Sequence, residues 1–159
     1  MEVLQNAPGS EPVIVEGYFP ASPARVFNAW TDPDAVKQWF GRQPNSLSDA
    51  IVDLKVGGRW CFLKAEDHGT KILFEGEYKV IEPGHRLVFS WSHVIAYESG
   101  KREATPHSLV EVEFRKKGNG CVVKLVHSKI RSDDARKGVG SGWLASFHAL
   151  HTLLSDTDR

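Results

Sequence analysis

ILFEGEYKV, residues 72–80, alternates apolar and charged side chains with a period of two. This period is typical of a strand with one buried face. Glu75, Glu77 and Lys79 share one face, which we expect to meet solvent. The opposite face is then predicted to point inward, and it carries Ile72, Phe74, Gly76, Tyr78 and Val80.

The same period continues on both sides of this segment. A strand is predicted at 13–19, before two short helices. The segment 96–106 is polar and is predicted to be a loop. Glycine-containing turns separate the other runs, at 57–58, 82–85 and 118–120. The remaining predicted strands cover residues 47–54, 59–65, 87–93, 109–117 and 121–128.

Helical spacing replaces the strand period in three places. Ser22 and Pro23 are typical of an N-cap and first helical position, and a second short helix is predicted to end at Gly41. The last helix is expected from about Ala135 to Leu154, with a narrow apolar stripe. The order predicts an α+β fold in which an antiparallel sheet is followed by one long helix.

The chain of 159 residues has the length of one domain. Residues 1–12 are polar and interrupted by proline and glycine, so we expect a disordered leader there. Residues 13–157 are then a single domain. Two cysteines, Cys61 and Cys121, are expected to be reduced thiols within strands.

Composition excludes several classes of protein. Twenty Lys and Arg balance twenty Asp and Glu, which argues against nucleic-acid partners and polybasic membrane-surface binding. No apolar run approaches the ~20 residues of a membrane span, and the N-terminus does not have the pattern of a signal peptide. We therefore expect a cytoplasmic protein.

Seven segments occur in an order that resembles a known family: SPARVFNAWTDP (22–33), WFG (39–41), DLKVGGRW (53–60), GEY (76–78), RLVFSW (86–91), LVHS (125–128) and GW (142–143). They resemble the family named for the C-terminal domain of the activator of the heat-shock-protein-90 ATPase. That family belongs to the START-like, or polyketide cyclase (SRPBCC), superfamily. The resemblance runs from about residue 13 to residue 155.

The resemblance implies the helix-grip, or START/Bet v-like, fold. In this fold a curved antiparallel sheet wraps around a long C-terminal helix, and two short helices after the first strand close one side. An apolar cavity lies between sheet and helix. In the superfamily it binds lipids, sterols, polyketides or plant hormones, and in a few branches it performs cyclisation or dehydration. Because fold alone does not give function, this remains an analogy.

Strand parity and the helical stripe together predict which side chains face such a cavity. His93 and His127 are expected at the same end of the sheet, each bringing a polar atom inward. The alternative is a packed core in which these histidines bond to backbone carbonyls. The predicted ligand-binding residues are Trp60, Phe74, Tyr78, Trp91, His93, His127, Trp143 and Phe147.

Signatures of catalysis or metal binding are absent from the sequence. There is no HExxH, CxxC, paired-carboxylate or Gly-x-Ser-x-Gly pattern, so no catalytic residue, metal or cofactor is predicted. The glycine-rich stretch 138–142 is interpreted as a flexible helix entrance where a ligand enters.

Three functions follow as hypotheses. The first is a binding protein for a small apolar or aromatic molecule. The second is a cyclase or dehydratase in which Tyr78, His93 or His127 acts as general acid or base, which requires two polar atoms within about 3–4 Å of one cavity position. The third is a chaperone ATPase regulator; eukaryotic activators of the resembled family carry a large extra N-terminal domain, whereas about twelve residues precede the first strand here. A homodimer through an edge strand also stays open.

Overall fold

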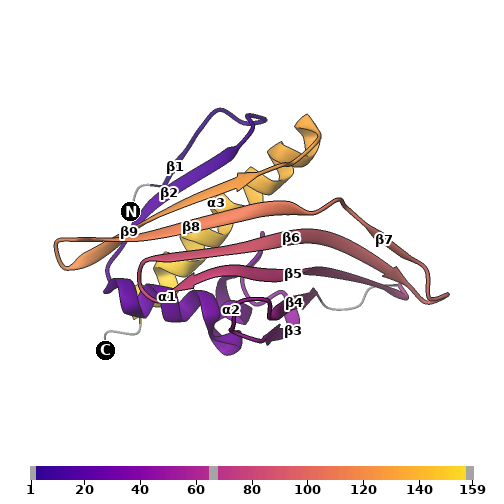
Figure 1. The fold of residues 1–159 in the computed structure, drawn as a ribbon, viewed down its shortest axis with the longest axis horizontal. Helices are drawn as coiled ribbons and strands as arrows, with labels where there is room; N and C mark the ends of the chain where they lie inside the picture. The colour runs from indigo at the N-terminus through magenta and orange to yellow at the C-terminus, as the bar shows by residue number, and fades with distance from the viewer. Residues whose placement is uncertain (1–2, 65–67, 157–159) are drawn as a thin grey trace.

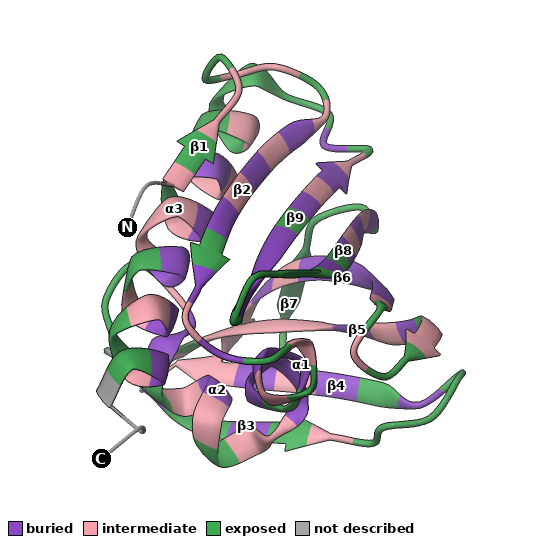
Figure 2. Cartoon of the chain, turned by 90° about the vertical axis from the view of Figure 1, so that its left-hand side faces the viewer, coloured by how far each residue is buried: buried purple, intermediate pink, exposed green. Residues whose placement is uncertain are grey.

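A strongly curved antiparallel sheet wraps around one long helix (Figures 1 and 2). The structure is a computed structural model, and it describes residues 3–64 and 68–156. Within these ranges the strands are β1 (Val3–Gln5), β2 (Val13–Phe19), β3 (Leu47–Val52), β4 (Arg59–Lys64), β5 (Thr70–Glu82), β6 (Arg86–Tyr97), β7 (Arg102–Ala104), β8 (Ser108–Lys117) and β9 (Gly120–Ser128). The helices are α1 (Pro23–Thr31), α2 (Pro33–Trp39) and α3 (Asp133–Asp156).

The sheet order is β1-β2-β9-β8-β6-β5-β4-β3, and β7 pairs with β6 beside this path. All of these pairs are antiparallel. Figure 2 shows buried residues alternating with less buried ones along β2 and recurring on α3. The predicted α+β helix-grip architecture is confirmed.

Two segments differ from the sequence-based expectation. In the segment expected to be a disordered leader, Val3–Gln5 forms β1, with Val3 opposite Gly17 of β2. The Asn6 side-chain oxygen also accepts from the Ile14 backbone at 3.0 Å. In the segment expected to be a polar loop, β7 pairs with the end of β6. Both strands are short and add backbone pairing at an edge, which needs no alternating apolar pattern.

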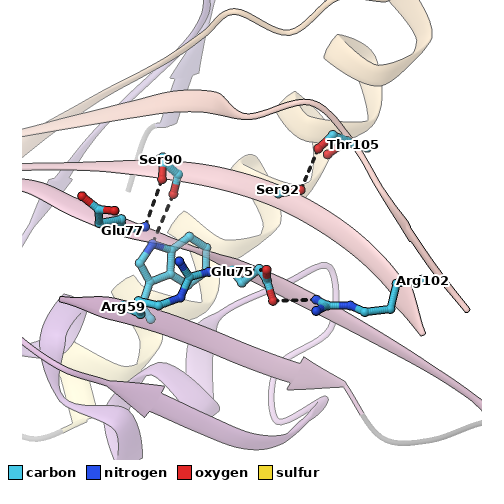
Figure 3. A network of polar contacts seen from close by, with 8 residues as sticks. Arg59, Glu75, Glu77, Ser90, Ser92, Arg102 and Thr105 are labelled. Carbon is cyan, nitrogen blue, oxygen red and sulfur yellow. Dashed lines mark hydrogen bonds and ion pairs between the residues drawn. The ribbon is translucent and has the colours of Figure 1, made fainter. Parts of the chain in front are cut away.

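The outer and inner faces of β5 follow the alternation of residues 72–80. On the outer face, Glu75 contacts Arg102 at 2.9 Å and Arg59 at 3.5 Å, and Figure 3 shows these side chains together. On the inner face Gly76 is buried, and a Cβ at this position would overlap the carbonyl oxygen of Ser90. Glycine therefore lets β5 and β6 approach closely at this point.

The two short helices begin at side-chain caps, of which Ser22 was predicted and Asp32 was not. The Ser22 hydroxyl accepts from the backbone of Arg25 at 3.2 Å, and the Asp32 carboxylate accepts from Asp34 at 3.0 Å. Each cap satisfies a backbone donor that the first helical turn leaves unpaired, and each helix has proline in its first turn. The connection between α1 and α2 is consequently a single residue, which holds the helices together.

Two tryptophans join these helices to the core. Trp39 is 1% exposed, and its indole N–H donates to the carbonyl of Ala29 in α1 at 2.9 Å. Its ring lies 4.8 Å from Trp30, which in turn stacks on Trp143 of α3 at 5.7 Å. The α1–α2 unit is thus packed against α3 through aromatic rings.

Replacing Trp39 with alanine should lower the free energy of unfolding by roughly 3–5 kcal/mol, because a buried ring and a hydrogen bond are lost. Chemical denaturation monitored by circular dichroism measures the change. Leu54→Ala is the matched control, since Leu54 is 43% exposed and should change stability by less than about 0.5 kcal/mol. A Trp39→Ala protein as stable as the control would contradict this packing role.

Candidate functional site

A cavity of about 800 Å³ lies between the sheet and the N-terminal half of α3. Residues of β5 and β6 form one wall, and α3 forms the opposite wall. The segments 40–47 and 129–132 supply the remaining sides. Small-molecule sites are typically concavities of about 300–1,000 Å³, so this space has the size for an organic ligand.

Small side chains on α3 make room for the cavity. Ala135, Gly138, Gly142 and Ser146 recur at helical spacing on the cavity side of the helix. The flexible entrance expected at 138–142 is instead part of α3. Its lack of side chains leaves open space between helix and sheet, and a Cβ added to Gly142 would meet no atom within 4 Å.

Four of the eight predicted ligand-binding residues line this cavity: Phe74, Trp91, His93 and Trp143. Their rings form a chain in which Trp91 lies 5.1 Å from Phe74 and 5.3 Å from Trp143. The ring of His93 lies 5.3 Å from Phe74. These residues come from three different elements, and the structure brings them to one aromatic wall.

Trp60 and Tyr78 lie elsewhere, beside a void of only about 10 Å³. A space of this size holds about one water molecule. Trp60 is 1% exposed and donates to the Ser90 carbonyl at 3.2 Å, while burial raises the pKa of Tyr78. Trp30 Nε1, in the same region, is buried without a partner among the described residues. This part of the interior is packed.

Phe147 also lies outside the cavity, although the helical stripe predicted it to contact a ligand. Its side chain is fully buried and packs against Phe19 at 5.6 Å and Trp30 at 6.2 Å. The stripe on α3 therefore divides at Trp143. Phe147 and Leu150, beyond Trp143 on this stripe, fill the core, whereas Gly138, Val139 and Gly142 before it border the cavity.

His127 is fully buried behind the aromatic wall. Trp143 Nε1 donates to His127 Nδ1 at 3.1 Å, and His127 Nε2 lies 2.7 Å from the Ser108 hydroxyl. Because an indole N–H can only donate, Nδ1 is the acceptor and the proton resides on Nε2. The Ser108 hydroxyl then donates to the carbonyl of Trp91. Both ring nitrogens are therefore occupied, and His127 positions Trp143 and Ser108 on the wall.

His93 differs from His127 in exposure and in bonding. Its side chain is half-buried, and neither ring nitrogen makes a hydrogen bond within residues 3–64 and 68–156. Burial lowers the pKa of His93, and the positive charge of Lys64 lowers it further. The ring is thus neutral at pH 7, with one N–H donor and one acceptor available to a ligand.

Sequence periodicity missed most of the cavity wall. Many of the missed residues lie in connections, where neither the strand nor the helix period applies, and Lys64 lies at the end of β4. Gly41 donates to the Ser146 hydroxyl at 2.9 Å and so ties the end of α2 to α3. The missed lining includes Arg42, Gln43, Ser46, Lys64, Lys129, Ile130, Arg131 and Ser132.

No metal-binding arrangement occurs in the described part of the chain, where no three His, Cys, Asp or Glu side chains cluster suitably. Cys61 and Cys121 are free, and burial raises the pKa of both thiols. None of the described helices is long and apolar enough to cross a membrane.

Residues 20–155 match the model of a protein family described as "Activator of Hsp90 ATPase homolog 1-like protein". The chain belongs to this family. The family hit and the similar structures together assign it to the START-like SRPBCC superfamily. No curated protein matches the sequence.

Solved structures share the fold of this family member. CalU16 from Micromonospora echinospora is 25% identical, with a TM-score of 0.66 over 98% of this chain and 87% of that one. A Rhodobacter sphaeroides protein is 19% identical, with a TM-score of 0.75 over 98% and 99% of the two chains. DynU16, from the dynemicin biosynthetic locus, is 23% identical, with a TM-score of 0.70 over 92% of this chain and 48% of that one.

The buried histidine gives the protein a specific dependence on pH. Burial lowers the pKa of His127 to about 3, against 6.5 for an unperturbed histidine. The unfolded chain therefore takes up a proton in this interval that the folded chain does not, and stability falls as pH falls below 6.5. Linkage at 1.36 kcal/mol per pKa unit puts the loss at about 2 kcal/mol between pH 7 and pH 5.

Denaturation at both pH values should show this loss in the wild type and a clearly smaller loss in His127→Gln, whose amide can still accept from Trp143 and donate to Ser108. His148→Gln is the control, because His148 is exposed on α3 and should leave the difference unchanged. A His127→Gln protein with the full wild-type loss would show that another group causes it.

Proposed function

We propose that this protein binds a small apolar or aromatic molecule in the cavity of about 800 Å³ between the sheet and α3. The observation that carries the proposal is the pairing of a large cavity with an aromatic wall. Phe74, Trp91 and Trp143 offer ring faces and edges on one side, and the small residues of α3 leave space on the other. Aromatic rings of a ligand can stack there in place of water.

Polar groups on the same wall would orient the ligand. His93 has an uncommitted ring, and Thr105, directly after β7, places a hydroxyl group on the cavity lining. A few polar groups within a mostly apolar concavity are typical of specific small-molecule sites. DynU16 comes from a biosynthetic locus, and a small organic ligand for the present chain agrees with that setting.

Binding accounts for the geometry better than cyclase-type catalysis. Tyr78 borders the small void, His93 borders the large cavity, and His127 is engaged at both ring nitrogens. Among the described residues, these three side chains make no hydrogen bond to one another. A general acid and base converging on one reacting atom is therefore not assembled from them. Regulation of a chaperone ATPase would act through the outer surface and would leave the cavity unexplained.

Pyrenebutanol, a neutral aromatic probe, should quench tryptophan emission saturably, since Trp91 and Trp143 line the cavity. Gly142→Phe should raise its dissociation constant at least tenfold, because a ring built on this position enters the cavity space. Replacing a helical glycine also removes an unfavourable helix propensity, so the fold should persist.

Ser141→Phe is the matched control. Ser141 neighbours Gly142 on α3 but is exposed, so the added ring points to solvent and the affinity should stay at the wild-type value. Equal binding by wild type, Gly142→Phe and Ser141→Phe would place the probe outside the cavity. An absence of saturable binding would overturn the proposal.

A further inference from the structure

The charged residues that line the large cavity all have the same sign. Arg42, Lys64, Lys129 and Arg131 border it, and no Asp or Glu of the described chain does. The whole sequence has twenty charged residues of each sign. A cavity lined by charged residues at random would therefore be expected to contain both positive and negative side chains. The cavity is therefore electropositive within a protein of zero net charge.

Several cations outside the cavity have carboxylate partners. On the outer face of the sheet, Arg102 and Arg59 meet Glu75, and Arg86 meets Glu111 at 3.0 Å. Figure 3 shows the contact between Arg102 and Glu75. These pairs neutralise one another locally, so the outer surface presents a mixed charge pattern.

The four cavity cations lack such partners. Within residues 3–64 and 68–156, none of their charged groups lies within 4.0 Å of a carboxylate oxygen. The Glu11 carboxylate accepts from the backbone N–H of Lys129 and not from its ammonium group. Arg42 makes one long contact, 3.4 Å to the carbonyl of Gly138. Their positive charges are therefore available to interact with a molecule in the cavity.

Lys64 is the best placed of the four to contact a bound molecule. It is half-buried at the end of β4, whereas Arg42, Lys129 and Arg131 are exposed at the rim. Its charge reaches His93, whose pKa it lowers. An anionic group between them would accept from the Lys64 ammonium and from the neutral His93 ring, and charge-assisted hydrogen bonds are the stronger kind.

We propose that the ligand is an amphipathic organic anion, with an aromatic body against Trp91 and Trp143 and a carboxylate at the cationic side near Lys64 and His93. This inference rests on the proposed function, because it names the chemical class of the molecule held in the same cavity. The three exposed cations attract the anion to the opening, and Lys64 holds it.

Three probes with one aromatic body test the charge preference directly. Pyrenebutyrate is anionic, pyrenebutanol neutral and pyrenebutylamine cationic. We expect pyrenebutyrate to bind at least tenfold more tightly than pyrenebutanol, and pyrenebutylamine to bind most weakly. Added NaCl should reduce the preference for the anion and leave pyrenebutanol binding nearly unchanged, because salt screens only the charged interaction.

Lys64→Gln should weaken pyrenebutyrate binding roughly tenfold, the loss expected for a hydrogen bond to a charged group, and should not weaken pyrenebutanol. Lys71→Gln is the matched control: Lys71 is exposed on β5 outside the cavity, so both affinities should be unchanged.

The outcomes separate the two proposals. If pyrenebutanol and pyrenebutyrate bind equally in wild type and in Lys64→Gln, the cavity binds aromatic molecules and the anion inference is overturned. If none of the three probes binds saturably, the binding function itself fails. A preference for pyrenebutyrate that Lys64→Gln leaves intact would overturn the role given to Lys64.

Discussion

The position of Trp143 is the constraint on which the rest of the structure depends. Its ring stacks on Trp30 from α1 at 5.7 Å and lies 5.9 Å from Phe40 and 5.3 Å from Trp91 of β6. Its N–H is held by His127 of β9. One side chain therefore contacts the two short helices, the sheet and the buried hydrogen bonds of His127. Because each contact restricts the same ring, the rotation of α3 about its own axis is defined at this point.

That rotation divides α3 into two functional halves. Beyond Trp143, residues such as Phe147 and Leu150 are fully buried, and each contributes roughly 1.5–3 kcal/mol through burial. Before it, Gly138 and Gly142 contribute no side chain, so space remains between this half of the helix and strands β5 and β6. An open cavity forfeits packing energy, and the densely packed half of the same helix offsets this cost. The C-terminal half of α3 thus contributes stability, while its N-terminal half borders the open cavity.

Burial explains why the two inward histidines have different roles. His127 is 0% exposed, neutral and bonded at both nitrogens, so it positions its neighbours and cannot reach a ligand. His93 is half-buried beside the electropositive wall, and its neutral ring keeps a free donor. Lys64, near the same place, supplies the charge that His93 lacks. In the proposed function, polar recognition is therefore concentrated at one side of the cavity, while the aromatic rings supply apolar contact.

Alternation in the strands, the Ser22 cap and the apolar stripe of the last helix predicted an antiparallel α+β fold with one long final helix and its inward side chains, and the resemblance carried by seven ordered segments added the helix-grip architecture. These signals are local: each depends on a repeat or on a cap within a few residues. They also predicted four cavity residues, including Trp91 and Trp143. Only the tertiary structure separated these from Trp60, Tyr78 and Phe147, and only it added the cationic residues at 42, 64, 129 and 131. Periodicity assigns a side chain to a face, but the distance between two faces is set by how helix and sheet pack. That distance decides whether an inward residue meets another side chain or open space.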